Sequence, residues 1–297
     1  MKRMCVFGTK LLAVCTGALL LVGCGGEDGT TDEKGTAQIF VEAEDTIPNG
    51  LVAGMGDEDI QDGWSVTYDR FLITIGNIRA SRSDATERLS APDTYVLDLK
   101  NVPAGGYVVA TFEDVSATRW DRFGFDLPNA NASTKALAPT SEEDRKLLAD
   151  NGWSLYIEGS MTNGAMTKTF RWGLAAGTSY DDCATEDEIP GFAVPAGGTV
   201  PVKPTIHGDH WFFNNITAGA EVTARYAQYI ADADVNMDGE TTLEELEQTQ
   251  AASVFPPDKY SLAGAPIETA YDYLLAQART LGDYQGDGEC PTRKALP

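Results

Sequence analysis

The chain has 297 residues, and its 45 acidic against 22 basic side chains give a formal charge of −23. A surface of that sign repels nucleic acid phosphates and anionic lipid head groups, so nucleic acid is excluded as an expected partner. The excess of acidic residues can be explained by solubility alone as well as by any function. The length is enough for one large hydrophobic core or two small ones.

The first 23 residues predict a secretory signal peptide. Lys2 and Arg3 precede an apolar run over residues 11–22, which is too short and wrongly flanked for a membrane-spanning helix. Residues 24–36 contain almost no apolar side chain and cannot offset the entropy cost of ordering, so we expect a flexible tether there.

The signal ends in Leu21-Val22-Gly23-Cys24, which resembles the bacterial lipobox, the motif at which a cysteine is lipidated. The resemblance implies that Cys24 becomes an acylated N-terminus and that the protein is anchored to a membrane without spanning it. A plain signal peptide that contains a cysteine is the alternative. Because residue 25 is Gly and not Asp, the sorting pattern of such lipoproteins implies the outer membrane of the cell envelope.

Residues 37–213 predict an antiparallel β-sandwich, since apolar and polar residues mostly alternate between turn signals. The clearest unit is a hairpin around Asn163-Gly164, because these residues tolerate the positive φ angles of a tight turn. One helix is expected after Thr140, ending at Gly152. Residues 198–206 are expected to form an edge strand, since their prolines cannot donate ladder hydrogen bonds. The other expected strands cover residues 37–43, 68–80, 95–99, 107–113, 153–161 and 166–172.

The stretch Asn101-Val-Pro-Ala-Gly-Gly-Tyr-Val-Val109 resembles transthyretin-like sandwich domains of secreted bacterial proteins. The resemblance implies a sandwich of transthyretin or immunoglobulin type. The whole chain is also similar to uncharacterised predicted lipoproteins in which a strand ending in Ile206-His-Gly-Asp-His210 precedes an acidic helix-loop-helix. That class implies a layout and no particular chemistry.

Residues 214–297 have a helical pattern, which makes the expected fold α+β with a helical subdomain after the sandwich. Helices are expected over residues 220–230, 242–251 and 266–282. Thr242 and Glu245 have the spacing of a capping box at the start of the second of these helices. Two cysteines outside the expected leader and lipidation site, Cys183 and Cys290, should pair in an oxidising compartment. Their disulfide would close a loop of roughly a hundred residues, stabilise the fold by about 4 kcal/mol in the chain-entropy model, and tie the helices to the strands.

Residues 234–245 have the ligand spacing of an EF-hand-type calcium site, with Gly239 at the sharp sixth position. An acidic loop that stays empty is the alternative. The ligands at positions 1, 3, 5, 7, 9 and 12 would be Asp234, Asn236, Asp238, the carbonyl of Glu240, Thr242 and Glu245.

A second loop of the same kind is missing. Asp283-Tyr-Gln-Gly-Asp-Gly288 imitates the start of one, but Lys294 stands where the closing acid should be. Thr241, at the eighth position, therefore has no equivalent residue in a second loop to pair with. An unpaired loop in an extracytoplasmic compartment favours calcium as a structural ion over calcium sensing.

His207 and His210 are the only two histidines of the chain, and Asp209 lies between them. Two imidazoles beside a carboxylate could hold zinc, copper or iron, with Asp209 as third ligand or as the group that orients an imidazole. The alternative is structural, with the histidines capping the strand end through hydrogen bonds to the backbone.

Other chemistry is hard to build from this sequence. Only the two histidines could act as base for a serine nucleophile, and no Gly-x-Ser-x-Gly turn is present. The carboxylates Glu42, Glu44 and Asp45 are uninformative in so acidic a chain. A sugar-binding platform and a sandwich core remain alternatives for Trp153, Tyr156, Trp172 and Trp211.

The leading hypothesis is thus a non-enzymatic, calcium-stabilised lipoprotein of the outer membrane that acts in binding or envelope structure. A transition-metal protein or metalloenzyme using His207 and His210 is the second hypothesis, and a carbohydrate-binding module is the third. The sequence does not identify a protein or carbohydrate partner.

Overall fold

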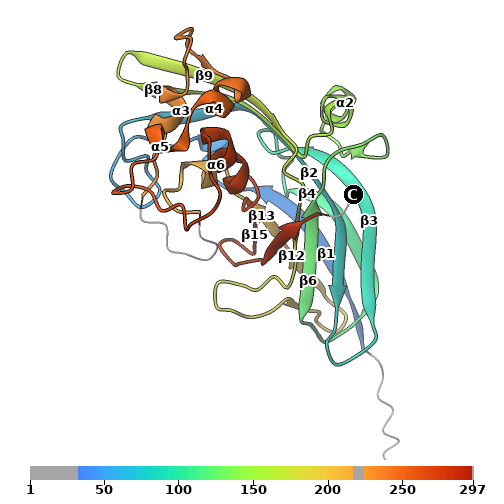
Figure 1. Ribbon diagram of the computed structural model, residues 1–297. Coiled ribbons are helices and arrows are strands. Elements are labelled where there is room, and N and C mark those ends of the chain that lie inside the picture. The colour runs from blue at the N-terminus through green and yellow to red at the C-terminus, as the bar shows by residue number, and fades with distance from the viewer. Residues whose placement is uncertain (1–32, 217–223, 296–297) are drawn as a thin grey trace, which may run out of the picture. The chain divides into compact units, whose positions relative to one another are not determined.

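The computed structural model describes residues 33–216 and 224–295 (Figure 1). The expected signal peptide, the expected lipidation site Cys24 and residues 25–32 of the expected tether therefore lie outside the described residues. Both expected parts, 37–213 and 214–297, fall within one compact unit that spans Asp32–Pro297. Within the described ranges, no helix is long and apolar enough to cross a membrane.

The described chain consists mainly of strands, which make up 42% of the structure against 16% for helices, so the fold is α+β with sheets predominating. The strands are β1 (Lys34–Ala43), β2 (Ser65–Ser81), β3 (Arg88–Asp98), β4 (Tyr107–Ser116), β5 (Arg119–Trp120), β6 (Arg122–Leu127), β7 (Lys135–Ala136), β8 (Leu155–Asn163), β9 (Met166–Leu174), β10 (Thr178–Tyr180), β11 (Phe192–Ala193), β12 (Thr199–Val202), β13 (Pro204–Ile206), β14 (Glu240–Thr241), β15 (Gly282–Tyr284) and β16 (Thr292–Lys294). The helices are α1 (Thr46–Asn49), α2 (Glu142–Asn151), the 3₁₀-helix η1 (His210–Phe212), α3 (Gln228–Asp232), α4 (Leu243–Gln248), α5 (Ala251–Val254) and α6 (Ala270–Gln277).

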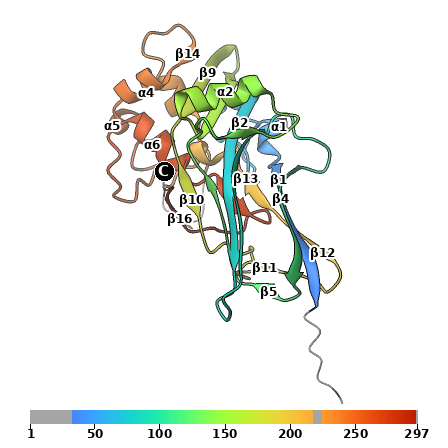
Figure 2. The same cartoon turned by 90° about the vertical axis from the view of Figure 1, so that its right-hand side faces the viewer.

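Two large sheets organise the described residues. One has nine strands in the order β14-β9-β8-β2-β6-β10-β16, with β3 also paired to β2 and β7 paired to β3. The other has the order β12-β1-β13-β15, with β4 also paired to β1. In Figure 2 the lower parts of the two sheets face each other. Ile39 of β1 and Ile73 of β2 belong to the same buried cluster, so the sheets share one core.

The expectation of antiparallel strands throughout is corrected by the pairing. Strand β1 runs parallel to both β12 and β13, β3 runs parallel to β7, and β14 runs parallel to β9. Parallel neighbours need a long crossover connection, and each of these pairs is separated by one. Strand β12 lies at a sheet edge as expected, but β13 is flanked by both β1 and β15.

Locally encoded elements agree well with the sequence. The hairpin of β8 and β9 is confirmed, with Asn163 opposite Met166 and Gly164 at φ +60° in the turn. The helix expected after Thr140 is α2, which ends at Gly152 in the left-handed conformation. The aromatic residues Trp172 and Trp211 are fully buried, so they belong to the core and offer no exposed sugar platform.

Several element boundaries differ from expectation. Strand β1 begins at Lys34, within the expected tether, because Lys34 and Gly35 pair with β4 through their backbones and need no apolar side chain. The helix expected over 220–230 begins only at Gln228, although residues 217–223 lie outside the described residues. The last helix, α6, starts at Ala270 because Thr269 forms a capping box with Asp272.

The C-terminal segment returns to the sheets as two short strands that the sequence did not predict. Strand β15 pairs with β13, and β16 pairs with β10. Cys183 and Cys290 form the expected disulfide, with a sequence separation of 107 residues. The helices α3 to α6, orange to red in Figure 1, gather beside hairpin β8–β9, and α2 lies apart from them.

Candidate metal centre

The turn that carries both histidines follows directly from β13. The backbone N–H of His207 donates to the Leu281 carbonyl (2.9 Å), and the N–H of Gly208 donates to Oγ1 of Thr46 (3.2 Å). A Cβ atom at Gly208 would lie 2.7 Å from Ile47, so only glycine fits this close approach. The turn is therefore held between β15 and α1.

Trp211 anchors the other end of the turn. Its indole N–H donates to the Tyr68 hydroxyl (2.9 Å), which in turn donates to the carbonyl of Gly208. The hydroxyl of Tyr229 donates to the Trp211 carbonyl (2.9 Å). Because Trp211 is fully buried, η1 is fixed to the core, and His210 at its first position is fixed with it.

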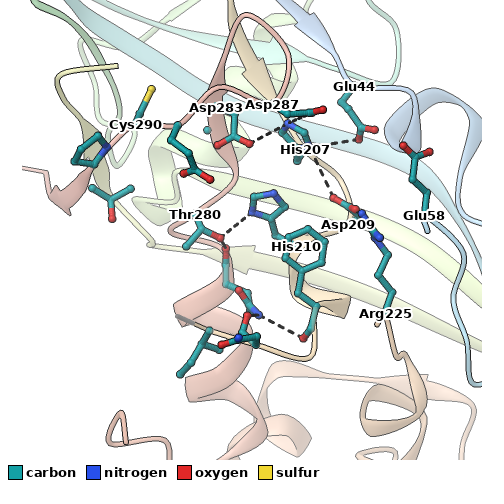
Figure 3. A pocket seen from close by; sticks show the side chains of 18 residues that line it. Glu44, Glu58, His207, Asp209, His210, Arg225, Thr280, Asp283, Asp287 and Cys290 are labelled. Atoms are coloured by element: carbon teal, nitrogen blue, oxygen red, sulfur yellow. Dashed lines mark hydrogen bonds and ion pairs between the residues drawn. The ribbon is translucent and has the colours of Figure 1, made fainter. Parts of the chain in front are cut away.

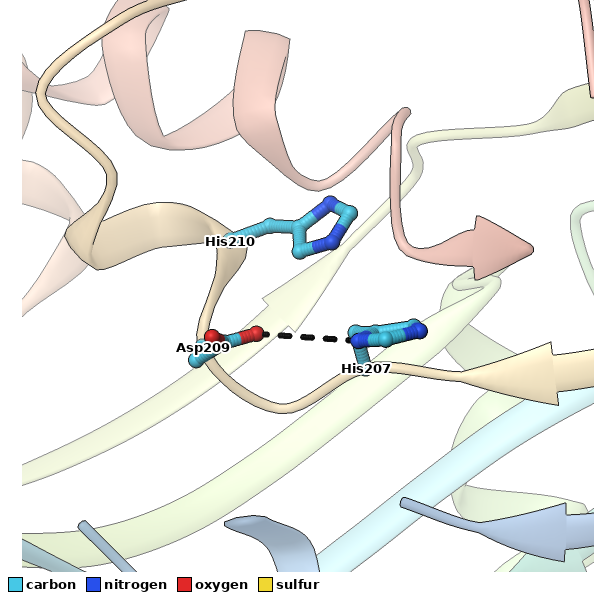
Figure 4. Close-up of side chains that lie close together, drawn as sticks. All are labelled: His207, Asp209 and His210. Carbon is cyan, nitrogen blue, oxygen red and sulfur yellow. Dashed lines mark ion pairs between the residues drawn. The ribbon is translucent and has the colours of Figure 1, made fainter. Parts of the chain in front are cut away.

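This turn brings together the three residues that the sequence singled out. His207, Asp209 and His210 are all buried, and their ligand atoms lie within 4.8 Å of one another (Figure 4). Nδ1 of His207 is 3.9 Å from Oδ1 of Asp209. When atoms surround a zinc-sized ion tetrahedrally at bond lengths of about 2.0–2.2 Å, they lie about 3.3–3.6 Å apart. The widest separation in this group would have to shorten by roughly 1.2 Å for the three atoms to hold such an ion.

Two of the three side chains are oriented by a neighbour. The hydroxyl of Thr280 donates to the carbonyl of Gln277 (2.9 Å), so it accepts from Nδ1 of His210 (2.8 Å). His210 thus carries its proton on Nδ1 and keeps the lone pair on Nε2. Oδ2 of Asp209 accepts from Nε of Arg225 (2.7 Å).

Two other atoms of the group lack partners. Oδ1 of Asp209 and Nε2 of His207 are buried and make no hydrogen bond in the described structure. An unpaired carboxylate oxygen on a side chain that is only 3% exposed is costly, because burial removes its water without replacing it. A bound cation at this point would remove that cost.

The structure adds three carboxylates that sequence reasoning missed. Oε2 of Glu44 lies 3.9 Å from Nδ1 of His207. On the opposite side of the ring, Oδ2 of Asp283 lies 3.2 Å from Nε2, and Oδ1 of Asp287 lies 3.9 Å from it (Figure 3). The segment 283–288, which imitates a calcium loop in the sequence, thus forms a wall of the histidine site.

The centre lies in a cavity of about 520 Å³. Phe213 and Ile216 supply an apolar part of its wall, and Arg225 is the one guanidinium among its described lining residues. The carboxylates that line it are Glu44, Glu58, Asp209, Asp283, Asp287 and Glu289. Such a surplus of acids attracts cations and disfavours anionic ligands.

The protonation of the site suits a metal ligand set. Burial lowers the pKa of His210 to about 3, so the imidazole is neutral at physiological pH. Burial raises the pKa of Asp283 to about 7, although His207 opposes this shift. Burial also raises the pKa of Glu44 above its ordinary value. A cation beside these carboxylates would favour their ionised forms.

The residues of the expected calcium loop are also brought together. Oδ1 of Asp234 accepts from the backbone N–H of Asp238 (3.2 Å), and Oδ1 of Asn236 accepts from the same group (2.8 Å). Oδ1 of Asp238 accepts from the N–H of Glu240 (2.9 Å). The side-chain oxygens therefore turn inward along the loop, and Gly239 has the positive φ of +91° expected at its sharp turn.

Glu245 closes this loop from α4. Its Oε1 accepts from the N–H of Asn236 (3.2 Å), and its Oε2 accepts from the N–H and the hydroxyl of Thr242 (3.0 Å each). The expected capping box of Thr242 and Glu245 is confirmed. Lys168 of β9 forms an ion pair with Asp234, whose side chain is fully buried.

Strand β9 takes the place of the missing second loop. Thr241 pairs with Phe170 in register, and the Trp172 indole donates to the Thr241 carbonyl (2.8 Å). Thr241 is fully buried, and its hydroxyl donates to the Ile230 carbonyl (2.9 Å). The position that usually joins two calcium loops is here joined to the large sheet.

No protein-family model matches this chain, and no curated protein or solved structure matches it. The function therefore has to follow from the chemistry of the site itself.

Proposed function

We propose that this protein is a metal-binding lipoprotein of the cell envelope, with a transition-metal centre at His207, Asp209 and His210. The observation that supports this proposal most directly is the unpaired, buried Oδ1 of Asp209, which faces Nδ1 of His207 at 3.9 Å. Because Nδ1 of His210 donates to Thr280, the lone pair of Nε2 is free to bind a metal ion. Two imidazoles and one carboxylate form a ligand set that suits zinc, copper or iron.

Glu44 is the fourth ligand in this proposal. It reaches the same nitrogen of His207 that Asp209 faces, and its side chain is only partly exposed. With Glu44 bound, the ion has two nitrogen and two oxygen ligands, and no external molecule is needed to complete tetrahedral coordination. That arrangement favours storage, transfer or structural use of the metal over catalysis.

A metalloenzyme is the second candidate, favoured by one observation. The cavity of about 520 Å³ beside the ligand group is far larger than a metal ion and has an apolar wall at Phe213. It would hold a small molecule next to the ion if Glu44 left a coordination position open.

We further propose that calcium binds in the loop 234–245 as a structural ion, in a helical subdomain beside a sandwich formed by the two sheets. The inward-facing oxygens of Asp234, Asn236 and Asp238 and the closing Glu245 support the site. The pairing of β14 with β9 supports the structural role, because calcium would fasten the loop to the large sheet.

The proposed location is the outer membrane, to which acyl chains on Cys24 would anchor the protein. This rests on the leader sequence, with its short apolar run and its lipobox-like end. The partners are then the membrane through the lipid anchor and an unidentified protein or carbohydrate. Radiolabelled palmitate incorporation by intact cells, lost in Cys24→Ala, tests the anchor.

Metal titration tests the centre. We expect the chelator-treated mature protein to bind one equivalent of zinc or copper, and His207→Ala plus His210→Ala to bind none at the same site. The variant Glu58→Gln is the matched control, because Glu58 lines the cavity, is exposed, and forms no hydrogen bond or ion pair with the ligand group in the described structure. Wild-type protein that takes up neither zinc, copper nor iron would contradict the proposal.

A further inference from the structure

We propose that Asp283 is the positioning residue of this centre: its carboxylate accepts the Nε2–H of His207 and so leaves Nδ1 as the metal ligand. The inference deepens the proposed function and rests on it. Histidine ligands commonly donate their second ring N–H to a carboxylate, which fixes the tautomer and the ring orientation and makes the ligand more basic. Asp283 supplies that group to His207 as Thr280 supplies a hydroxyl to His210.

Strand pairing places Asp283 beside His207. In the β13–β15 ladder, Thr205 is opposite Asp283 and Ile206 is opposite Gly282. The backbone N–H of His207 extends this ladder by donating to the Leu281 carbonyl. The two side chains therefore meet through sheet register, which is a more rigid placement than a loop would give.

The position of β15 is itself tightly held. A Cβ atom at Gly282 would lie 2.7 Å from the ring of Tyr180, so the strand sits directly against a buried aromatic side chain. At the end of β15, the backbones of Tyr284 and Gly288 form two hydrogen bonds with each other (2.7 and 3.0 Å). The disulfide of Cys290 follows two residues later. Asp283 thus has little freedom to leave His207.

The distance between Asp283 and His207 supports a hydrogen bond between their side chains. Oδ2 of Asp283 lies 3.2 Å from Nε2 of His207, within donor–acceptor reach, and the two side chains are 14% and 9% exposed. Nε2 is buried and makes no hydrogen bond in the described structure, so the ring has to rotate to align its N–H with the carboxylate. The other nitrogen, Nδ1, faces Asp209 and Glu44.

Asp287 offers a matched control. It approaches the same nitrogen, at 3.9 Å, but its side chain is 79% exposed. An exposed carboxylate at that distance is well screened by solvent and contributes little to the orientation of a ring. The two single variants Asp283→Asn and Asp287→Asn therefore each remove one negative charge from the same side of His207.

The first readout is the tautomer of His207, measured by ¹⁵N NMR on the metal-free wild-type protein. The chain has two histidines, so one variant, His210→Gln, assigns the signals. We expect the proton on Nε2 in the wild type and in Asp287→Asn, and a mixed population in Asp283→Asn, because an amide also presents a donor. A proton on Nδ1 in the wild type would overturn the proposal.

The second readout is the zinc dissociation constant from chelator competition. We expect Asp283→Asn to weaken binding by about 10- to 100-fold at unchanged stoichiometry, and Asp287→Asn to change it by less than about threefold. Complete loss of binding in Asp283→Asn, as in His207→Ala, would overturn the proposal by making Asp283 a direct ligand. An unchanged constant would overturn it too.

Failure of the proposed function is distinguishable from failure of this inference. If the wild type binds no transition metal, the centre itself is refuted, whereas the tautomer of the metal-free protein still tests the Asp283 contact. Thermal melting of each variant checks folding. If Asp283→Asn does not fold, the wild-type tautomer alone decides.

Discussion

Oδ2 of Asp209 accepts a hydrogen bond from Nε of Arg225 at 2.7 Å, while Oδ1 of the same carboxylate faces His207 without a partner. One aspartate thus joins a partly buried ion pair to the candidate metal centre. Arg225 is held in addition by the carbonyl of Asp57 and lies over the ring of Phe213 at 4.9 Å.

Asp209→Ala should therefore lower the free energy of unfolding by about 1–3 kcal/mol in metal-free protein, because it leaves a partly buried guanidinium without its charge partner. Arg225 has a side chain that is only 13% exposed. The double variant Asp209→Ala plus Arg225→Met should recover part of the loss. Urea denaturation measures the free energy of unfolding of the single and the double variant. If Asp209→Ala is as stable as the wild type, the ion pair of Asp209 and Arg225 does not stabilise the fold.

Lys168→Met should tighten calcium binding by about tenfold or more, since the Lys168 ammonium pairs with the carboxylate that would ligate the ion. Isothermal titration with calcium measures the effect. Arg171→Met is the control on the same strand, because the Arg171 side chain is 65% exposed and pairs with Glu158 instead. Equal calcium affinity in the wild type and Lys168→Met would contradict the proposed role of Asp234.

Glu245→Ala should remove the rise in melting temperature that calcium gives the wild type. Binding to the native state alone stabilises by about 2.7 kcal/mol at a calcium concentration 100 times the dissociation constant. Glu244→Ala is the neighbouring control, because Glu244 is exposed on the same helix turn. A wild-type melting temperature that ignores millimolar calcium would leave the loop without its proposed ligand.

Cys183→Ala plus Cys290→Ala should lower the free energy of unfolding by about 4–5 kcal/mol, the chain-entropy value for a loop of this length. The disulfide encloses 107 residues of sequence separation, and Cys290 also lines the metal cavity. We expect weaker zinc binding in the same variant, because the wall of Asp283 and Asp287 loses a covalent attachment. Guanidinium denaturation gives the first quantity, and an unchanged midpoint would refute the expectation.

Acid should destabilise the metal-free protein through His210. Burial lowers its folded-state pKa to about 3, whereas the unfolded chain protonates near 6.5. Between these values the unfolded state binds more protons, so this contribution falls as pH falls from about 6.5 to 3. The variant His210→Asn lacks that loss, and the stability difference between it and the wild type should shrink with acidity. A difference independent of pH would exclude a buried neutral His210.

The sequence predicted features whose information is local. Gly164 in its turn and the capping box of Thr242 and Glu245 depend on residues a few positions apart, and both are confirmed. The disulfide was predictable by elimination, since Cys183 and Cys290 alone remained to pair.

The sequence could not predict features that long-range pairing creates. Asp283 reaches His207 only through the β13–β15 ladder, and Glu44 reaches it from β1's far end, so neither signal stands out in a chain rich in acids. Residues 283–288 stand out in the sequence only as the incomplete start of a second calcium loop. The parallel pairing of β1 with β12 and β13 was hidden for the same reason.

The central claim is a metal ion between His207, Asp209 and His210, and anomalous X-ray scattering from crystals of the zinc-loaded protein tests it most directly. Data collected above and below the zinc absorption edge should give one difference peak within about 2.2 Å of an imidazole nitrogen of each histidine and of Oδ1 of Asp209. Absence of such a peak, or a peak bound elsewhere on the chain with these three side chains left empty, would contradict it.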